Sequence, residues 1–154
     1  MPIDAHQHFW TYDEAEYGWI AEGGLRALER DFLPDDLRPL LDQRGVDGTV
    51  AVQARQDLEE SEWLLGLADD HLWIRGVVGW VDLTADPATI QRDLETFAAH
   101  PKFVGIRHIT QDEPDVNWQI RDDVMRGLAV LEKMGVAYDL LFYTQHLKHA
   151  ATLG

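Results

Sequence analysis

The strongest constraint on the fold is a repeated alternation of short apolar segments with longer segments of helical periodicity. The apolar segments are rich in valine and other strand-forming residues, and aspartate, proline or glycine stands at the ends of the helical ones. Strands are expected at residues 2–6, 48–54, 75–81, 103–107 and 136–141, and helices at 37–44, 57–70, 86–100 and 122–134. This order predicts a parallel sheet covered by helices.

The two faces of the expected strands differ in character. Branched apolar residues share one face in two of them, Val50 with Val52 and Val104 with Ile106. The opposite face is small in the middle of the strands and polar near their C-terminal ends. A doubly wound sheet has helices on both faces, so this asymmetry favours a barrel interior. The predicted fold class is α/β, a (β/α)8 TIM barrel of which about the first five β/α units are present.

Polar residues on the expected inner face gather late in their strands, where barrels of this kind assemble active sites. They are Asp4, His6, His8, Gln53, Trp80, Asp82, Arg107 and Asp139. Structural alternatives stay open for three of them, because Gln53 can satisfy backbone groups, Trp80 can be core and Asp82 can cap a turn. Asp139 is expected to be buried, which calls for a partner such as Arg107.

Composition excludes several classes of function. The chain has 13 Lys and Arg against 28 Asp and Glu, and a net charge of -15 repels nucleic-acid phosphates and anionic membranes. It has no cysteine, which excludes disulfides and thiolate chemistry. Neither a phosphate-binding glycine loop nor a nucleophilic serine elbow occurs. No secretory leader or membrane-spanning run is found, so we expect a cytoplasmic protein without nucleic-acid or membrane partners.

The first strand carries two histidines in the sequence Asp4-Ala-His-Gln-His8. Residues two apart in a strand point to the same side, about 6 to 7 Å apart along the chain. His6 and His8 can therefore converge on one point, where two imidazoles can share a divalent metal ion or orient a carbonyl group. His108, which directly follows Arg107 at the end of the fourth strand, is a third histidine near the same edge.

Five spaced motifs, in this order along the chain, resemble the amidohydrolase-related family (amidohydrolase 2) of L-fuconolactonase and L-rhamnonolactonase type. They are Asp4-Ala-His-Gln-His-Phe-Trp10, Val52-Gln-Ala54, Gly76-Val-Val-Gly-Trp-Val-Asp-Leu83, Gly105-Ile-Arg-His108 with Gln111-Asp-Glu-Pro-Asp115, and Tyr138-Asp-Leu-Leu141. The resemblance implies a TIM barrel that hydrolyses a sugar-acid lactone in carbohydrate catabolism. It also implies a small-molecule sugar lactone as substrate.

The resemblance further implies roles for individual residues. The expected catalytic residues are His6, His8, Arg107 and His108. The expected substrate-binding residues are Gln53, Trp80, Asp139 and Trp10. The segment 11–33 shows no clear strand or helix period through Gly24, and we expect it to be a loop over the mouth of the pocket.

The resemblance also bears on the cofactor. A two-metal site of this superfamily needs a lysine at the end of strand four and a histidine after strand five. Here Arg107 and His108 end strand four, Lys102 precedes it, and strand five offers Asp139. We therefore expect either no required cofactor or one divalent ion, zinc by preference, held by His6 and His8.

The resemblance covers only the first part of a barrel, since eight strands typically need about 250 residues. Residues 1–154 are expected to form one amidohydrolase-related domain truncated at its C-terminus, with a helix-like stretch at 144–154. The general base would lie outside this sequence. Three alternatives remain open: a metal-dependent amidohydrolase or decarboxylase of the same superfamily, an inactive fragment or binding domain, and a homo-oligomer in which a second copy pairs with the open sheet.

Overall fold

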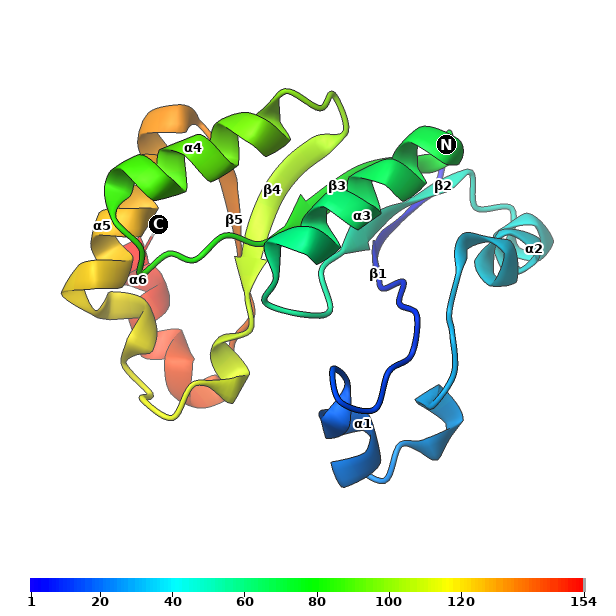
Figure 1. Cartoon of the computed structure of the whole chain (residues 1–154), viewed down its shortest axis with the longest axis horizontal. Coiled ribbons are helices and arrows are strands. Elements are labelled where there is room, and N and C mark those ends of the chain that lie inside the picture. Colours follow the sequence, from blue (N-terminus) through cyan, green and yellow to red (C-terminus); the bar gives the residue numbers. More distant parts are fainter. Residues whose placement is uncertain (154) are drawn as a thin grey trace.

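The computed structural model describes residues 1–153 and has an α/β architecture (Figure 1). Its strands are β1 (Ile3–Gln7), β2 (Gly48–Val52), β3 (Ile74–Gly79), β4 (Phe103–His108) and β5 (Ala137–Leu140). Its α-helices are α1 (Gly18–Glu22), α2 (Pro34–Arg44), α3 (Leu58–Asp70), α4 (Pro87–Ala98), α5 (Asp122–Met134) and α6 (Ala150–Leu153). Short 3₁₀ helices are η1 (Arg26–Leu28), η2 (Thr110–Asp112), η3 (Trp118–Ile120) and η4 (Thr144–His149).

The five strands form one sheet in the order β1-β2-β3-β4-β5, and every neighbouring pair is parallel. Sequential order with helical crossovers is the topology of a (β/α) barrel, and the sheet curls into half of one. The sequence-based strands and the four long helices are confirmed to within two or three residues at each end. The expected α/β class and the five β/α units are therefore confirmed.

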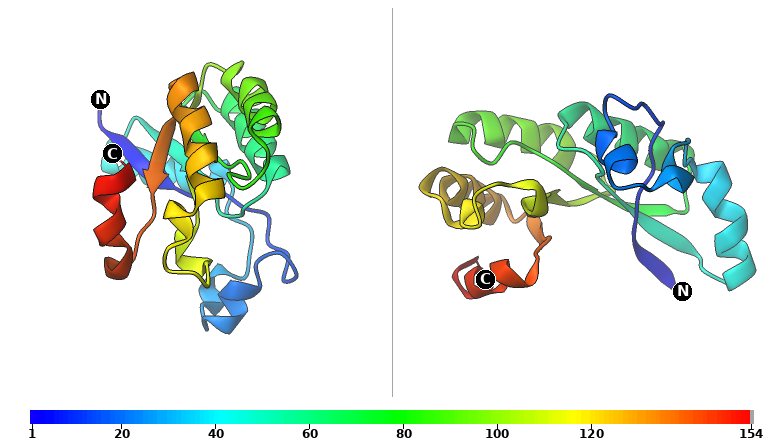
Figure 2. Two further views of the ribbon diagram at one scale, coloured as in Figure 1. Left: turned by 90° about the vertical axis from the view of Figure 1, so that its left-hand side faces the viewer. Right: turned by 90° about the horizontal axis from the view of Figure 1, so that it is seen from below.

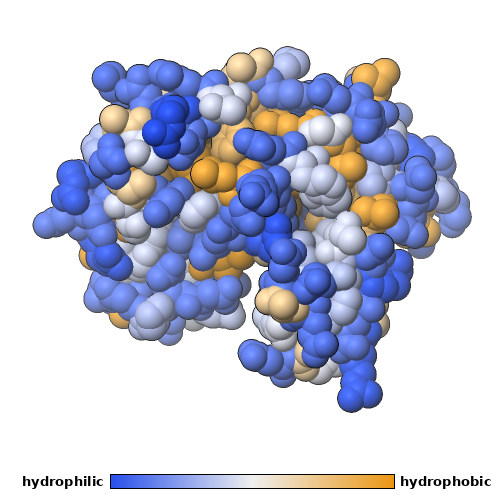
Figure 3. Space-filling view, viewed as in Figure 1, coloured by the Kyte–Doolittle hydropathy of each residue, from blue (hydrophilic) through white to orange (hydrophobic). Residues whose placement is uncertain are grey.

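Helices cover one side of the sheet. Figure 2 shows α3, α4 and α5 along the outer side, while the concave side opens between β1 and the C-terminal helices. The core lies beneath the helices and includes Ala51, Leu64, Val77, Ile90, Leu94, Ile106, Val124 and Leu131. On the face seen in Figure 3 the surface is mostly hydrophilic, with hydrophobic residues gathered near its middle.

The helix ends follow from local sequence. The Asp57 side chain accepts a hydrogen bond from the Glu59 N–H, and the Asp86 side chain accepts two, one from the Thr89 N–H, so both aspartates cap N-termini. Gly45 and Gly135 end α2 and α5 with φ of 65° and 69°, a left-handed conformation that glycine adopts without steric cost.

The prediction that Val50 and Val104 face the helices was wrong. A side chain added at Gly76 would meet the methyl groups of both valines, so the three residues share a face, and Val104 is 48% exposed. Ala51 lies in the core instead, whereas Ile106 lies there as the pattern predicts. The register shifts between β2 and β3 and between β3 and β4 are the physical reason, since an irregular residue reverses the alternation that the sequence pattern assumes.

The segment 11–33 is more ordered than a plain loop. It contains α1 and η1, and its ends are joined by an antiparallel bridge between Trp10 and Phe32. A small cluster of Trp10, Tyr17 and Ile20 holds it beyond the C-terminal end of β1 (Figure 1). The helix expected near the C-terminus is present as η4 and α6, and Gly154 lies outside the described residues. In residues 1–153 no helix has the length and apolar character needed to cross a bilayer.

Candidate active site

His6 and His8 lie at the C-terminal end of β1 and their rings meet. Their Nε2 atoms are 3.2 Å apart and the rings pack edge to face with centroids 4.9 Å apart. The His8 Nδ1 lies 2.8 Å from the Val52 carbonyl oxygen, so Nδ1 carries the proton that it donates to this acceptor. The strand spacing therefore brings the two imidazoles to one point, as the sequence predicts.

Arg107 reaches this histidine pair from β4 across the concave side. Its Nη1 donates to the His6 Nε2 at 3.0 Å, and its Nη2 donates to the backbone carbonyl and side-chain oxygen of Gln53. Gln53 returns a bond from its Nε2 to the Arg107 carbonyl oxygen at 3.1 Å. Both Arg107 and Gln53 are buried. The structure thus brings together four of the eight predicted site residues, from three different strands.

The surroundings keep both imidazoles neutral. Burial lowers the pKa of His8 to about 4, against the opposing effect of its bond to Val52. Burial and then the Arg107 charge lower the pKa of His6. The neutral His8 carries its proton on Nδ1, so its Nε2 has a free lone pair, whereas the one lone pair of His6 Nε2 accepts from Arg107. A cation held between the two Nε2 atoms would have to displace the bond from Arg107 to His6.

A divalent metal ion fits these two residues in part. Two nitrogen ligands bound about 2.05 Å from a tetrahedral zinc ion lie roughly 3.3 Å apart, close to the 3.2 Å between these Nε2 atoms. Over residues 1–153, however, no third histidine, cysteine or acidic residue joins them in a metal-binding group. His6 and His8 can therefore supply two ligands of a metal ion, and its other ligands would have to come from outside residues 1–153.

His108 occupies a different environment from the histidine pair. Its Nδ1 accepts a hydrogen bond from the Trp80 indole N–H at 3.2 Å, and its Nε2 lies 2.7 Å from the Glu113 carboxylate. The ring stacks on Trp118 with centroids 3.7 Å apart. Burial is the main cause that lowers the pKa of His108, and Glu113 opposes it. Both nitrogens of this buried ring are therefore already engaged.

The remaining predicted residues make no hydrogen bond to the histidine pair within residues 1–153, but the Asp139 charge acts on His6 and Arg107. Trp10 is buried in the cluster beside Tyr17 and Phe32, and Trp80 is partly buried beside His108. Asp139 pairs with Arg107 in the ladder between β4 and β5, yet it is exposed, so the expectation of a buried carboxylate was wrong. The cause is that β5 is the last strand of the sheet described here. Asp82 caps a turn through bonds from the Thr84 N–H and hydroxyl.

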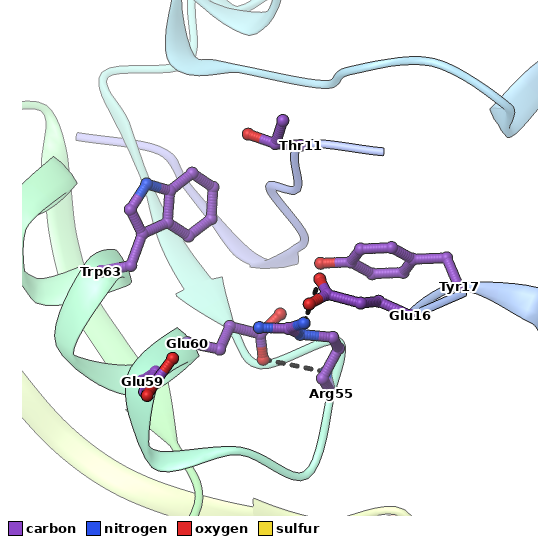
Figure 4. Close-up of a pocket in the computed structure, with 7 residues that line it drawn as sticks. All are labelled: Thr11, Glu16, Tyr17, Arg55, Glu59, Glu60 and Trp63. Atoms are coloured by element: carbon purple, nitrogen blue, oxygen red, sulfur yellow. Dashed lines mark hydrogen bonds and ion pairs between the residues drawn. The ribbon is translucent and has the colours of Figure 1, made fainter. Parts of the chain in front are cut away.

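Sequence reasoning missed Glu60, a buried carboxylate near the site. It lies in the first turn of α3, is 2% exposed, and accepts the N–H groups of Ala54 and Arg55. Burial raises its pKa to about 7. Glu60 also lines a cavity of about 260 Å³ together with Thr11, Glu16, Tyr17, Arg55, Glu59 and Trp63 (Figure 4). The sequence offered one signal, an acidic residue three positions beyond the Asp57 cap, where exposed glutamates are also common.

Five parallel strands form a half-barrel, with a histidine pair at the end of the first strand facing an arginine on the fourth. The amidohydrolase family model matches residues 3–152, and the chain belongs to this family.

Two curated relatives show which members of this family the chain is similar to. The chain is 43% identical over 148 residues to an L-fucono-1,5-lactonase of Burkholderia multivorans, an alignment that covers 96% of the chain and 49% of the relative. An L-fucono-1,5-lactonase of Burkholderia ambifaria is 40% identical, with 94% and 49% covered. The chain thus spans about half the length of the curated relatives that it matches.

A solved structure of a Burkholderia multivorans amidohydrolase with bound HEPES matches with a TM-score of 0.90 and 38% identity, over 99% of this chain and 52% of that one. A second crystal form of that protein, with bound zinc, gives a TM-score of 0.86. A probable 2-pyrone-4,6-dicarboxylic acid hydrolase of Acinetobacter baumannii, 17% identical, shares the fold with a TM-score of 0.71.

Proposed function

We propose that this chain forms the N-terminal half of a lactonase that opens a sugar-acid lactone of the L-fucono-1,5-lactone type. The observation that carries the proposal is the contact of the neutral His6–His8 pair with the Arg107 guanidinium, in a chain 43% identical to a protein of that activity. A lactone carbonyl needs groups that stabilise negative charge on its oxygen while water attacks. An arginine beside two neutral imidazoles is such a group.

His6 is the member of the cluster that can touch substrate, because its side chain is exposed whereas Arg107 is buried. Arg107 fixes the His6 tautomer by donating to Nε2, so the His6 proton is on Nδ1. The guanidinium charge also stabilises the oxyanion that develops at the carbonyl. We expect the carboxylate that activates the water in the full-length protein to come from beyond residue 154. Ring opening then gives the free sugar acid.

His6 and His8 would hold a divalent ion if the full-length protein uses one, as the related amidohydrolase with bound zinc suggests. Such an ion would supply Lewis-acid polarisation of the carbonyl. The backbone carbonyl of Val52 would orient His8 in that case, because it fixes the proton on Nδ1 and leaves Nε2 for the ion.

The test is hydrolysis of L-fucono-1,5-lactone by the full-length protein, followed with a pH indicator because the product acid releases a proton. We expect turnover well above the spontaneous rate, and L-rhamnono-1,4-lactone as a second substrate tests the sugar preference. Lactone opening no faster than in buffer would contradict the proposal.

A second candidate is a metal-dependent amidohydrolase or decarboxylase. The distance of 3.2 Å between the Nε2 atoms of His6 and His8 suits two ligands of one metal ion in either reaction. Dialysis against a chelator distinguishes this candidate from the lactonase. Retained lactone turnover favours the metal-free lactonase, whereas loss restored by zinc together with turnover of an amide or carboxylated substrate favours the second candidate.

A further inference from the structure

We propose that Glu60 is a positioning residue for the reaction centre, acting through the loop after β2 to hold Arg107 against His6. The inference rests on the proposed function and deepens it. Glu60 lies on the covering helix α3 and does not reach the histidines itself. It acts through a continuous series of hydrogen bonds that joins the helix to the concave side of the sheet.

The first link fixes the backbone after Gln53. One Glu60 oxygen, Oε2, accepts from the Ala54 N–H at 3.0 Å. The same oxygen accepts from the Arg55 N–H at 2.8 Å (Figure 4). Two amides donating to one buried carboxylate oxygen are charge-assisted hydrogen bonds, which are stronger than neutral ones. They hold the chain at the point where β2 ends, immediately beyond Gln53.

The second link joins that point to the reaction centre. Gln53 is fully buried, and its own N–H donates to the Val78 carbonyl oxygen at 2.8 Å. Its carbonyl and side-chain oxygens both accept from Arg107 Nη2, and its Nε2 donates back to the Arg107 carbonyl. Arg107 Nη1 then donates to His6. A shift of Gln53 would therefore move the guanidinium relative to the imidazole.

The charged and titratable groups around Glu60 come from three parts of the chain. Arg55 and Asp57 lie in the loop after β2, Tyr17 lies in the segment after β1, and Arg107 lies on β4. Arg55 is itself paired with Glu16 and Asp57. The other Glu60 oxygen, Oε1, is buried without a hydrogen-bond partner among the described residues.

The first experiment compares Glu60→Gln with Glu62→Gln in the full-length protein. Glu62 is exposed on the same helix and makes no hydrogen bond to the loop within residues 1–153, so it is the matched control. Misplacement of a catalytic group by about 1 Å lowers rates by up to about 100-fold. We expect Glu60→Gln to lower kcat about 10-fold or more with little change in KM, and Glu62→Gln to leave both unchanged. An unchanged kcat in Glu60→Gln, or a rise in KM alone, would overturn the inference.

The second experiment asks whether Glu60 acts through Arg107. If it does, Glu60→Gln in an Arg107→Lys background adds little further loss, because the group being positioned is already replaced. If Glu60 acts only on folding, Glu60→Gln should lower kcat by the same factor in both backgrounds. Equal losses would therefore overturn the inference.

A third measurement does not depend on turnover and separates this inference from the proposed function. In nuclear magnetic resonance spectra of the unmutated protein, the Arg107 side-chain N–H signals should exchange slowly with water because the guanidinium is held and buried. We expect Glu60→Gln to shift and broaden them and Glu62→Gln to leave them in place. Unshifted signals in Glu60→Gln overturn the positioning role, whereas shifted signals in a protein without lactone turnover overturn the proposed function alone.

Discussion

The two sides of the sheet hold histidines in opposite states. On the concave side, the Nε2 atoms of His6 and His8 lie 3.2 Å apart and His6 is exposed. Near the covered side, His108 is buried, stacked on Trp118, and bonded at both ring nitrogens. The same residue type is therefore exposed beside Arg107 on one side and packed with both nitrogens bonded on the other.

This difference shows why strand position alone does not identify a catalytic histidine. Each of the three histidines lies at or next to the C-terminal end of a strand, the edge where barrel active sites form. What distinguishes them is exposure and which nitrogens are engaged. His6 is exposed and makes its contacts through Nε2, whereas His108 is buried and bonded at both ring nitrogens. A histidine with both nitrogens engaged, such as His108, must break a buried bond before it can transfer a proton.

The largest expected effect is on the concave side. Replacement of His6 with alanine in the full-length protein should lower kcat for lactone hydrolysis about 100-fold to 1,000-fold, the usual loss when one group that stabilises an oxyanion is removed. The melting temperature should change little, because His6 is exposed. Steady-state kinetics and thermal unfolding measure the two quantities, with His71→Ala as the control histidine outside the site. Full activity in His6→Ala would break the contrast between the two sides.

Glu60 connects the two sides and gives the protein a pH-dependent stability. Its carboxyl has an unfolded pKa near 4.5 and a folded pKa raised to about 7, so between these values the folded state binds more protons than the unfolded state. The free energy of unfolding should therefore fall as the pH rises from about 4.5 to 7 and level off above that, by about 3 kcal/mol in total. Urea unfolding across this range measures the slope.

The matched variant for this slope is Glu60→Gln, whose side chain does not titrate. We expect its stability to vary less over the same pH range by about the amount assigned to Glu60. Parallel curves for the two proteins would show that other groups cause the dependence.

Much of the fold was predictable because local chemistry determines it. Asp57 and Asp86 cap their helices as the sequence indicates, Gly45 and Gly135 end theirs, and the order of elements predicts the parallel sheet. The face assignment of Val104 was not predictable in this way, because the register shift between β3 and β4 depends on how two strands meet.

The site was predictable to a smaller extent. The spacing of His6 and His8 fixes their convergence, and the position of Arg107 at the end of its strand places it near them. The engagement of His108 depends on Trp118 and Glu113, which reach it through packing that no local pattern specifies. Glu60 was missed because its burial comes from the segment after β1, more than 40 residues earlier in the printed sequence.

On the covered side we expect His108→Leu to act on stability more than on chemistry. The substitution keeps an apolar side chain against Trp118 but leaves the Trp80 N–H and the Glu113 carboxylate without their partner. Unsatisfied buried groups cost about 1 to 3 kcal/mol each, so unfolding should become easier by about 2 kcal/mol or more. Chemical denaturation measures it. If kcat falls as far as in His6→Ala while the folded population is intact, then His108 takes part in catalysis and the contrast fails.

The smallest effects test how tightly the covering helices pack, and two helical glycines form a matched pair. A Cβ added at Gly127 in α5 would overlap the backbone carbonyl of Leu83, whereas one added at Gly66 in α3 would meet nothing within 4 Å. Gly127→Ala should therefore lower the free energy of unfolding by about 1 to 3 kcal/mol through overpacking. Gly66→Ala should raise it by about 0.5 to 1 kcal/mol, because alanine loses less backbone entropy in a helix. Urea unfolding of both variants gives the two signs. Equal changes in the free energy of unfolding of the two variants would mean that α5 does not pack closely against the Leu83 backbone in the loop after β3.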